Sequence, residues 1–166
     1  MCASATMDEP EHASVAFESM VKLNSIGEKL GKLDYVKAMT DVTGFGLLGH
    51  LSEMCEGSGL QAVIEFDKVP KIDVIDEYLE QGSIPGGTNR NWTSYGHKIG
   101  HVSERQKHIL ADPQTSGGLL VAIEHGCEKE FEALLKENGI PENNIIAFGR
   151  LDEQSGSPVI CVNTSA

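Results

Sequence analysis

The sequence of 166 residues carries 13 Lys and Arg against 25 Asp and Glu, so its net charge is −12. This balance excludes a general nucleic-acid binder, because phosphate contacts need clustered basic side chains. Hydrophobic residues make up 40% of the chain but form no run that could span a bilayer, so we expect a soluble domain with a real core and no membrane contact. No apolar segment follows the first residues, and the four cysteines form no zinc or thioredoxin-like motif, which predicts no signal peptide and a cytoplasmic location.

Hydrophobic spacing predicts helices and strands that do not alternate strictly. Helices are expected over residues 13–30, from the glycine-rich segment 44–49 to 56, and over 73–81, 103–110 and 127–138. Ser103 is expected to cap the helix over 103–110. Strands are expected over residues 35–40, 60–66, 119–123, 145–149 and 158–162. Residues 1–12 are expected to be a disordered or remnant N-terminal segment. Residues 13–166 are expected to form one compact α/β (α+β) domain, with helices packed on a mixed sheet rather than a doubly wound fold.

The segment 40–46, Thr-Asp-Val-Thr-Gly-Phe-Gly, leads from a predicted strand into a predicted helix. Its two glycines and Gly49 fall in the first half of that helix, where each costs roughly 1 kcal/mol relative to alanine. Such a cost suggests that the backbone comes close to a packed neighbour or to a ligand. Asp41 and Thr43 stand where helix amides favour anions, but both are also good N-caps, so capping and ligand binding remain open.

Two further segments are rich in glycine and polar residues. Segment 85–91, Pro-Gly-Gly-Thr-Asn-Arg-Asn, belongs to residues 83–102, which are predicted to be irregular and too long for an ordinary connection. Its Arg90 can hold an anion with two hydrogen bonds. Segment 112–118, Asp-Pro-Gln-Thr-Ser-Gly-Gly, combines a carboxylate, an amide, two hydroxyls and two glycines. Neither is a P-loop or a dinucleotide fingerprint, so a phosphate or metal pocket competes with plain turns and a surface ion pair of Arg90.

Four single residues invite an interpretation of their own. His97 and His101 are four residues apart, but the glycines beside them make a shared helix doubtful, so we interpret both as exposed or capping rather than as metal ligands. His50 lies on the more polar side of its helix, and its role stays open. Trp92 is expected to anchor the long irregular segment on the core.

Taken together, the three segments are similar to one known family. Segment 40–50 resembles the signature that opens the C-terminal domain of selenophosphate synthetase (selenide, water dikinase). Segments 85–91 and 112–120 resemble later motifs of that family in the same order, and residues 19–24 resemble its lead-in helix. The likeness runs from about residue 15 to residue 162. It implies the fold of the C-terminal domain of aminoimidazole ribonucleotide synthetase-type enzymes, the superfamily that contains this family.

The resemblance also implies a reaction. The family enzyme is a phosphotransferase that makes selenophosphate, AMP and phosphate from ATP, selenide and water, with Mg²⁺, for selenocysteine and selenouridine synthesis. Its reactive cysteine or selenocysteine and its essential lysine lie in an N-terminal ATP-binding half, and no part of this sequence matches that segment. The resemblance therefore implies no catalytic residue in this chain, and we expect the chain alone to be inactive.

The resemblance assigns roles residue by residue. Asp41 matches the family aspartate that helps to hold Mg²⁺ beside the ATP phosphates, which fits the preference of this cation for one or two carboxylates. Thr43 and Gly44 would lie next to it. Further positions expected around the active cleft are Thr88, Arg90, Asn91, Asp112 and Thr115.

The implied partner is the chain's own N-terminal ATP-binding half. The full enzyme is expected to be a homodimer held through the N-terminal halves, and the isolated domain a monomer. An alternative of another class is a free-standing, non-catalytic domain that binds an anion or a partner. Other members of the superfamily, such as the purine enzyme, the thiamine phosphate kinase or the hydrogenase maturation factor, fit the second and third segments less well.

Overall fold

The computed structural model describes residues 10–163. Its helices are α1 (Pro10–Val21), α2 (Gly27–Leu30), α3 (Gly46–Ser58), α4 (Ile75–Glu80), α5 (Gly86–Tyr95), α6 (Glu104–Leu110) and α7 (Glu128–Glu137), with short 3-10 turns η1 (Phe66–Lys68), η2 (Gly96–Lys98) and η3 (Glu142–Asn144). Its strands are β1 (Val36–Asp41), β2 (Leu60–Glu65), β3 (Leu119–Ile123), β4 (Gly149–Glu153) and β5 (Ile160–Asn163). Residues 1–9 of the expected N-terminal segment lie outside the described residues, whereas residues 10–12 form the first turn of α1.

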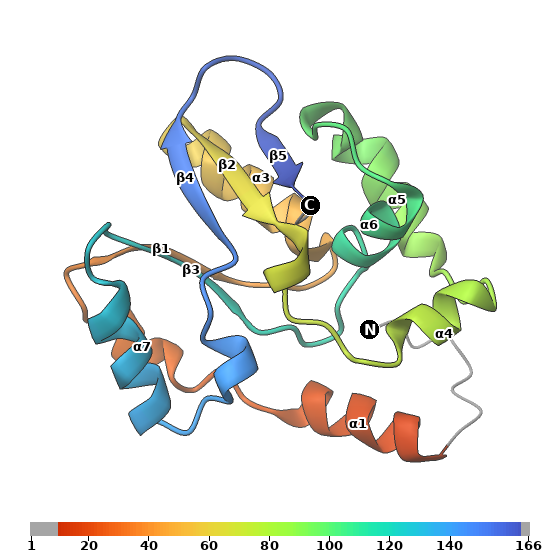
Figure 1. The fold of residues 1–166 in the computed structure, drawn as a ribbon, viewed down its shortest axis with the longest axis horizontal. Helices are drawn as coiled ribbons and strands as arrows, with labels where there is room; N and C mark the ends of the chain where they lie inside the picture. The colour runs from red at the N-terminus through yellow and green to blue at the C-terminus, as the bar shows by residue number, and fades with distance from the viewer. Residues whose placement is uncertain (1–9, 164–166) are drawn as a thin grey trace.

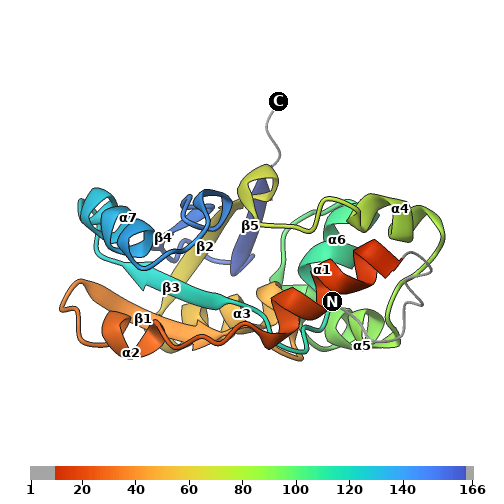
Figure 2. The same cartoon turned by 90° about the horizontal axis from the view of Figure 1, so that it is seen from below.

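The strands lie between two groups of helices. In both views α7 stands at one end of the molecule, and α4, α5 and α6 gather at the other (Figure 1, Figure 2). Strands β1 and β3 pair antiparallel, with Asp41 opposite Leu119. The second sheet has the order β4-β2-β5, in which β2 is antiparallel to β4 and parallel to β5. This confirms the predicted α/β class with mixed strand pairing and packed helices, although the strands divide into two sheets rather than one.

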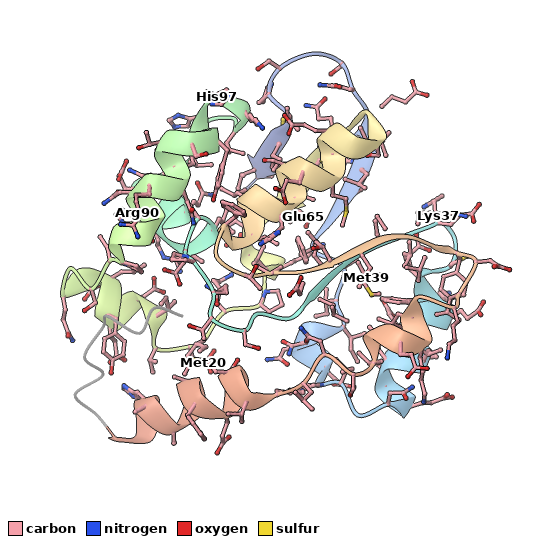
Figure 3. The ribbon with its side chains drawn as sticks, turned by 180° about the vertical axis from the view of Figure 1, so that it is seen from behind. Met20, Lys37, Met39, Glu65, Arg90 and His97 are labelled. Atoms are coloured by element: carbon pink, nitrogen blue, oxygen red, sulfur yellow. The ribbon has the colours of Figure 1, made fainter. Side chains whose placement is uncertain are left out.

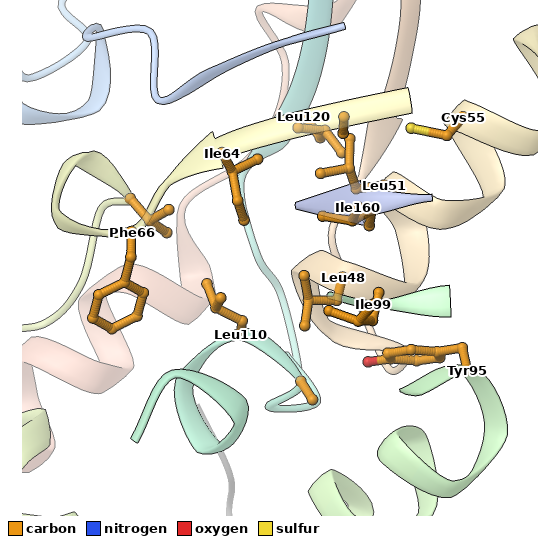
Figure 4. Packing of buried hydrophobic residues seen from close by; sticks show 13 residues of the cluster. Leu48, Leu51, Cys55, Ile64, Phe66, Tyr95, Ile99, Leu110, Leu120 and Ile160 are labelled. Atoms are coloured by element: carbon orange, nitrogen blue, oxygen red, sulfur yellow. The ribbon is translucent and has the colours of Figure 1, made fainter. Parts of the chain in front are cut away.

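Two hydrophobic clusters hold these layers together. The first joins α3, β2, β5, α5 and α6, and its members include Leu48, Leu51, Ile64, Leu110 and Ile160 (Figure 4). The second lies between α2, α7 and the β1–β3 pair and is built around Leu30, Leu135 and Ile145. Successive side chains of a strand point to opposite faces. For this reason Leu120 of β3 belongs to the first cluster, while Leu119 and Val121 pack against the second.

The prediction of a long irregular segment at 83–102 is wrong. Residues 86–95 form α5, followed by η2. Pro85 stands in an extended conformation at the N-cap, where its fixed φ suits the start of a helix. The buried residues of α5 are Thr88, Asn91 and Tyr95, which are spaced as one helix face. The helical period was therefore present in polar residues, and hydrophobic spacing missed it.

Three other boundaries differ from the prediction. The helix expected over 13–30 breaks after Val21, because residues 24–27 turn back, with the Gly27 amide donating to the Asn24 carbonyl at 2.9 Å. Asn and Ser compete for such backbone bonds outside helices. The strand expected over 145–149 is wrong, since β4 begins only at Gly149 and Ile145 packs in the second cluster. The strand expected over 158–162 is shifted to β5.

Two local predictions are confirmed. Ser103 caps α6 in a capping box, in which its side chain accepts from the Gln106 amide and the Gln106 side chain accepts from the Ser103 amide. The helix expected over 127–138 is α7, and its Phe131, Leu134 and Leu135 pack in the second cluster. None of the helices in residues 10–163 combines the length and the apolar character that crossing a bilayer requires.

Candidate functional site

The first and third glycine-rich segments lie side by side. The Val42 amide donates to the Gly118 carbonyl, and the Gly117 amide donates back to the Val42 carbonyl, both at 3.0 Å. The Gln114 amide donates to the Thr43 carbonyl at 3.0 Å. These bonds extend the β1–β3 pairing beyond its last strand residues. Segments 70 residues apart in the sequence thus become one piece of backbone.

The second segment joins them through one side chain. Asn91 of α5 is buried, and its amide nitrogen donates to the Gly44 carbonyl at 2.9 Å and to the Ala111 carbonyl at 3.0 Å. All three segments therefore meet in the structure. We refer to residues 42–46, 87–91 and 111–118 as the loop junction.

Most glycines of the loop junction are explained by close packing. A Cβ atom on Gly117 would overlap the Val42 carbonyl oxygen. On Gly87 it would lie 2.7 Å from Pro113 Cγ, and on Gly46, whose φ is +68°, it would lie 2.8 Å from the Ala111 carbonyl carbon. Gly44 differs, because a Cβ there would meet no atom within 4 Å. Packing thus accounts for three of the five glycines of the loop junction, whereas Gly44 and Gly118 meet no atom within 4 Å and leave the backbone open to a ligand.

The structure does not show the alternative in which Asp41 or Thr43 caps the following helix. Helix α3 begins at Gly46, so Gly44 precedes it, and its N-cap Phe45 receives no side-chain hydrogen bond. Thr43 instead contacts a histidine within the same helix. The Thr43 amide donates to His50 Nε2 at 3.0 Å, and Thr43 Oγ1 lies 3.1 Å from the same nitrogen. The Thr43 amide is therefore already occupied and is not a donor for an anion.

Asp41 is the exposed last residue of β1. Within residues 10–163 its carboxylate has no hydrogen-bond or ion-pair partner, and no group of three His, Cys, Asp or Glu residues there could hold a metal by itself. Mg²⁺ keeps several waters and is usually bound by one or two carboxylates together with phosphate oxygens. An unpaired, accessible carboxylate fits one place in such a ligand set. The remaining ligands would have to come from outside the described residues.

A small surface pocket opens beside this strand. Its volume is 160 Å³, and it is lined by residues of β1 and α3, namely Ala38, Met39, Thr40, His50, Glu53 and Met54. Met39 is labelled on β1 in Figure 3. Because Thr40 precedes Asp41, the pocket and the carboxylate lie at the same end of the strand.

Both carboxylate oxygens of Asp112 accept hydrogen bonds from side chains of the loop junction. Its Oδ2 accepts from the Gln114 side chain at 2.9 Å, and its Oδ1 accepts from Thr88 Oγ1 at 3.4 Å. Burial raises the pKa of the Asp112 carboxyl, and these hydrogen bonds lower it by less. Thr88 is fully buried. The contacts of both residues hold the second and third segments together.

Arg90 and Thr115 are exposed. Figure 3 labels Arg90 on α5, and among the residues described its guanidinium forms no ion pair. Within residues 10–163 the surface ion pair considered for Arg90 is therefore not formed, and no described carboxylate competes with an anion for this side chain. The candidate positions thus divide into an exposed set of Asp41, Gly44, Arg90 and Thr115 and an inward set of Thr43, Thr88, Asn91 and Asp112.

Sequence reasoning missed two residues that contact the loop junction. His50 was left open, although its position seven residues after Thr43, two helical turns, is a usable signal. Tyr95 donates from its hydroxyl to the Phe45 carbonyl at 2.6 Å, and burial raises its pKa, so it remains a protonated donor. Trp92, expected to act as an anchor, packs against the first cluster as predicted, but from a helix. His97 and His101 are exposed and share no helix.

The site thus belongs to an α/β domain in which three glycine-rich segments meet beside the exposed Asp41 carboxylate. The chain belongs to the family described as AIR synthase related protein, C-terminal domain, whose family model matches residues 3–156. It is 56% identical over 142 residues to a selenide, water dikinase of Colwellia psychrerythraea, covering 86% of this chain and 40% of that protein. Similar relatives of the same name occur in Haemophilus influenzae (49% over 152 residues; 92% and 43%) and Photorhabdus laumondii (50% over 155 residues; 93% and 44%). The chain therefore spans less than half the length of these curated relatives.

Proposed function

We propose that this chain is the C-terminal part of a selenide, water dikinase, which forms selenophosphate, AMP and phosphate from ATP, selenide and water. The observation that carries the proposal is the identity of 49–56% to relatives of that name over 86–93% of the chain. The meeting of all three motif segments supports it further. The enzyme would be a phosphotransferase of selenium metabolism acting in the cytoplasm.

Within that enzyme the exposed set would face the phosphates of ATP. Asp41 would provide one carboxylate oxygen to Mg²⁺, which when bound would neutralise charge on the transferring phosphoryl group. The Arg90 guanidinium, which has no ion-pair partner among the described residues, can pair with a phosphate oxygen, and Gly44 leaves room for close approach of a ligand to the backbone. Asn91 and Thr88 would act indirectly, by fixing the loops. No residue of this chain would act as nucleophile.

The partner of this chain would be the preceding, ATP-binding part of the same polypeptide. Helix α1 supports this, because it exposes Val15, Phe17 and Val21, and Leu23 follows it on the surface. Such a row of large apolar side chains is typical of a surface that packs against another unit. We propose that α1 contacts the ATP-binding part, that the complete enzyme is a homodimer, and that the chain alone is an inactive monomer.

A chimaera tests this function directly. It joins the preceding part of the Colwellia psychrerythraea enzyme to this chain, and selenide-dependent AMP formation is measured. The wild-type chimaera is expected to be active with Mg²⁺, while the 166-residue chain alone forms no AMP. Asp41→Ala is expected to lower turnover about 100-fold, the scale of losing one electrostatic contact to a developing charge. Asp73→Ala, at another exposed aspartate, is the matched control. Activity of the chain alone, or full activity of the Asp41 variant, would contradict the proposal.

A further inference from the structure

His50 has a defined hydrogen-bonding state. Its ring is buried, with 8% of the residue exposed, and Nε2 lies 3.0 Å from the Thr43 amide nitrogen. A backbone N–H can only donate, so Nε2 accepts and carries no proton. The proton of the neutral ring must then sit on Nδ1, which lies 3.5 Å from Glu53 Oε2. The surroundings of His50 thus select one tautomer.

Thr43 is held from both sides. Its amide donates to His50, and its carbonyl accepts from the amides of Gly46 and Gln114, each at 3.0 Å. The Phe45 ring packs edge to face on the imidazole, with centroids 5.8 Å apart. His50 is therefore the side chain through which α3 holds both the turn at 43–45 and, by way of Thr43, the third segment.

We propose that His50 is a positioning residue for the ligand site: its unprotonated Nε2 fixes the Thr43–Gly44 turn, so that Asp41 and the open Gly44 backbone keep their places beside the ligand. The effect on turnover rests on the proposed function, whereas the hold on Thr43, meaning the hydrogen bond from its amide to His50 Nε2, does not. His50 itself touches no reacting atom. It acts because the residue it binds lies two positions from Asp41 and next to Gly44.

The proposal requires a hydrogen-bond acceptor at the position of Nε2. Two amide side chains of different length test this requirement, because only the longer one reaches that position. Glutamine puts its amide oxygen close to the place of Nε2, so His50→Gln keeps the bond to Thr43. Asparagine reaches only the place of Nδ1, so His50→Asn loses the bond while remaining polar. A merely space-filling role would not separate the two variants in this order.

The first experiment uses the 166-residue chain and NMR. The ring ¹⁵N shifts of His50 are expected to report the Nδ1–H tautomer, and Thr43 amide exchange is expected to be slow. His50→Asn should speed that exchange about tenfold, the scale of one lost hydrogen bond, while His50→Gln should not. His97→Gln, at an exposed histidine, is the control. A proton on Nε2, or unchanged exchange in His50→Asn, would overturn the hold on Thr43.

The second experiment uses the chimaera. His50→Asn is expected to lower kcat/KM about tenfold and to raise the Mg²⁺ concentration needed, with His50→Gln near wild type. An active wild-type chimaera in which His50→Asn is equally active would overturn the positioning role. A folded but inactive wild-type chimaera that shows the expected ring shifts would overturn the proposed function, and it would leave the hold on Thr43 supported.

Discussion

The loop junction and helix α1 differ in where their contacts are found. In the loop junction, backbone groups are paired across segments far apart in sequence, and Gly46, Gly87 and Gly117 sit where a Cβ would collide. In α1, Phe17 is 61% and Val21 is 54% exposed, and Leu23 just beyond is 82% exposed. The junction is thus specified by contacts inside this chain. The outer face of α1 has apolar side chains without comparable contacts in residues 10–163.

Helix α1 is attached along one side only. Ala16 is buried, and His12 Nδ1 lies 3.0 Å from the Tyr78 hydroxyl, with the two rings edge to face at 5.8 Å. Figure 1 shows α1 lying along the lower edge of the molecule, below α4. Substitutions at the tightly packed positions of the loop junction should therefore lower the stability of the fold. Substitutions on the outer face of α1 should have little effect on this chain and a larger effect on the binding of whatever covers that face.

The largest effect is expected at Gly117. Gly117→Ala would place a Cβ against the Val42 carbonyl oxygen, which must move because both atoms belong to rigid backbone. We expect a loss of about 3 kcal/mol in the free energy of unfolding, measured with urea. The adjacent Gly118 is the matched control, since a Cβ there meets no atom within 4 Å. Equal stability of the two variants would mean that the segments are not packed as described.

A smaller loss is expected at Asn91. Asn91→Leu keeps the volume roughly constant but removes the donor to the Gly44 and Ala111 carbonyls. Leaving the buried Ala111 carbonyl without this donor costs about 2 kcal/mol. The exposed Asn89→Leu should change the free energy of unfolding by less than about 0.5 kcal/mol. If Asn89→Leu were the more damaging of the two, Asn91 would not be the link between the motifs.

Asp112 makes the junction sensitive to pH. Burial raises the pKa of its carboxyl above the unfolded value, so the folded state disfavours the charged form. Its contribution to stability is therefore complete below the unfolded pKa, about 3.9 for aspartate, and is lost as pH rises through the folded pKa. We expect the free energy of unfolding of the wild type, measured with urea, to fall relative to that of Asp112→Asn as pH rises from about 3.9 through the folded pKa. The opposite slope would mean that the carboxyl is stabilised in its charged form.

The sequence identified the three segments that form the loop junction, but it did not predict all the contacts between them and the helices. The three segments were found because glycines, hydroxyls and an arginine cluster in them, and these segments do meet. The contact between Thr43 and His50 was not predicted, because a bond from a turn to a helix depends on where that helix starts. The helix was expected to include Gly44, but it begins at Gly46, where φ is +68°.

The prediction of the fold was limited in the same way, because local signals were found and long-range contacts were not. Ser103, followed three residues later by Gln106, predicted a capped helix because that signal is local. Helix α5 was missed because two of its three buried residues, Thr88 and Asn91, are polar, and a hydrophobic pattern does not include them. The order β4-β2-β5 joins strands that are distant in sequence, and side-chain alternation carries no information about such partners.

The smallest effect on this chain is expected on α1. The double variant Phe17→Ser with Val21→Ser should change the free energy of unfolding by less than about 0.5 kcal/mol, because both side chains already face water. In the chimaera the same double variant should lower activity, because two serine hydroxyls would then be buried where α1 contacts the ATP-binding part. Glu18→Ser, also exposed on α1, is the matched control. A loss above about 1 kcal/mol in the isolated chain would show that these side chains pack within it. Unchanged activity in the chimaera would mean that α1 is not the contact surface.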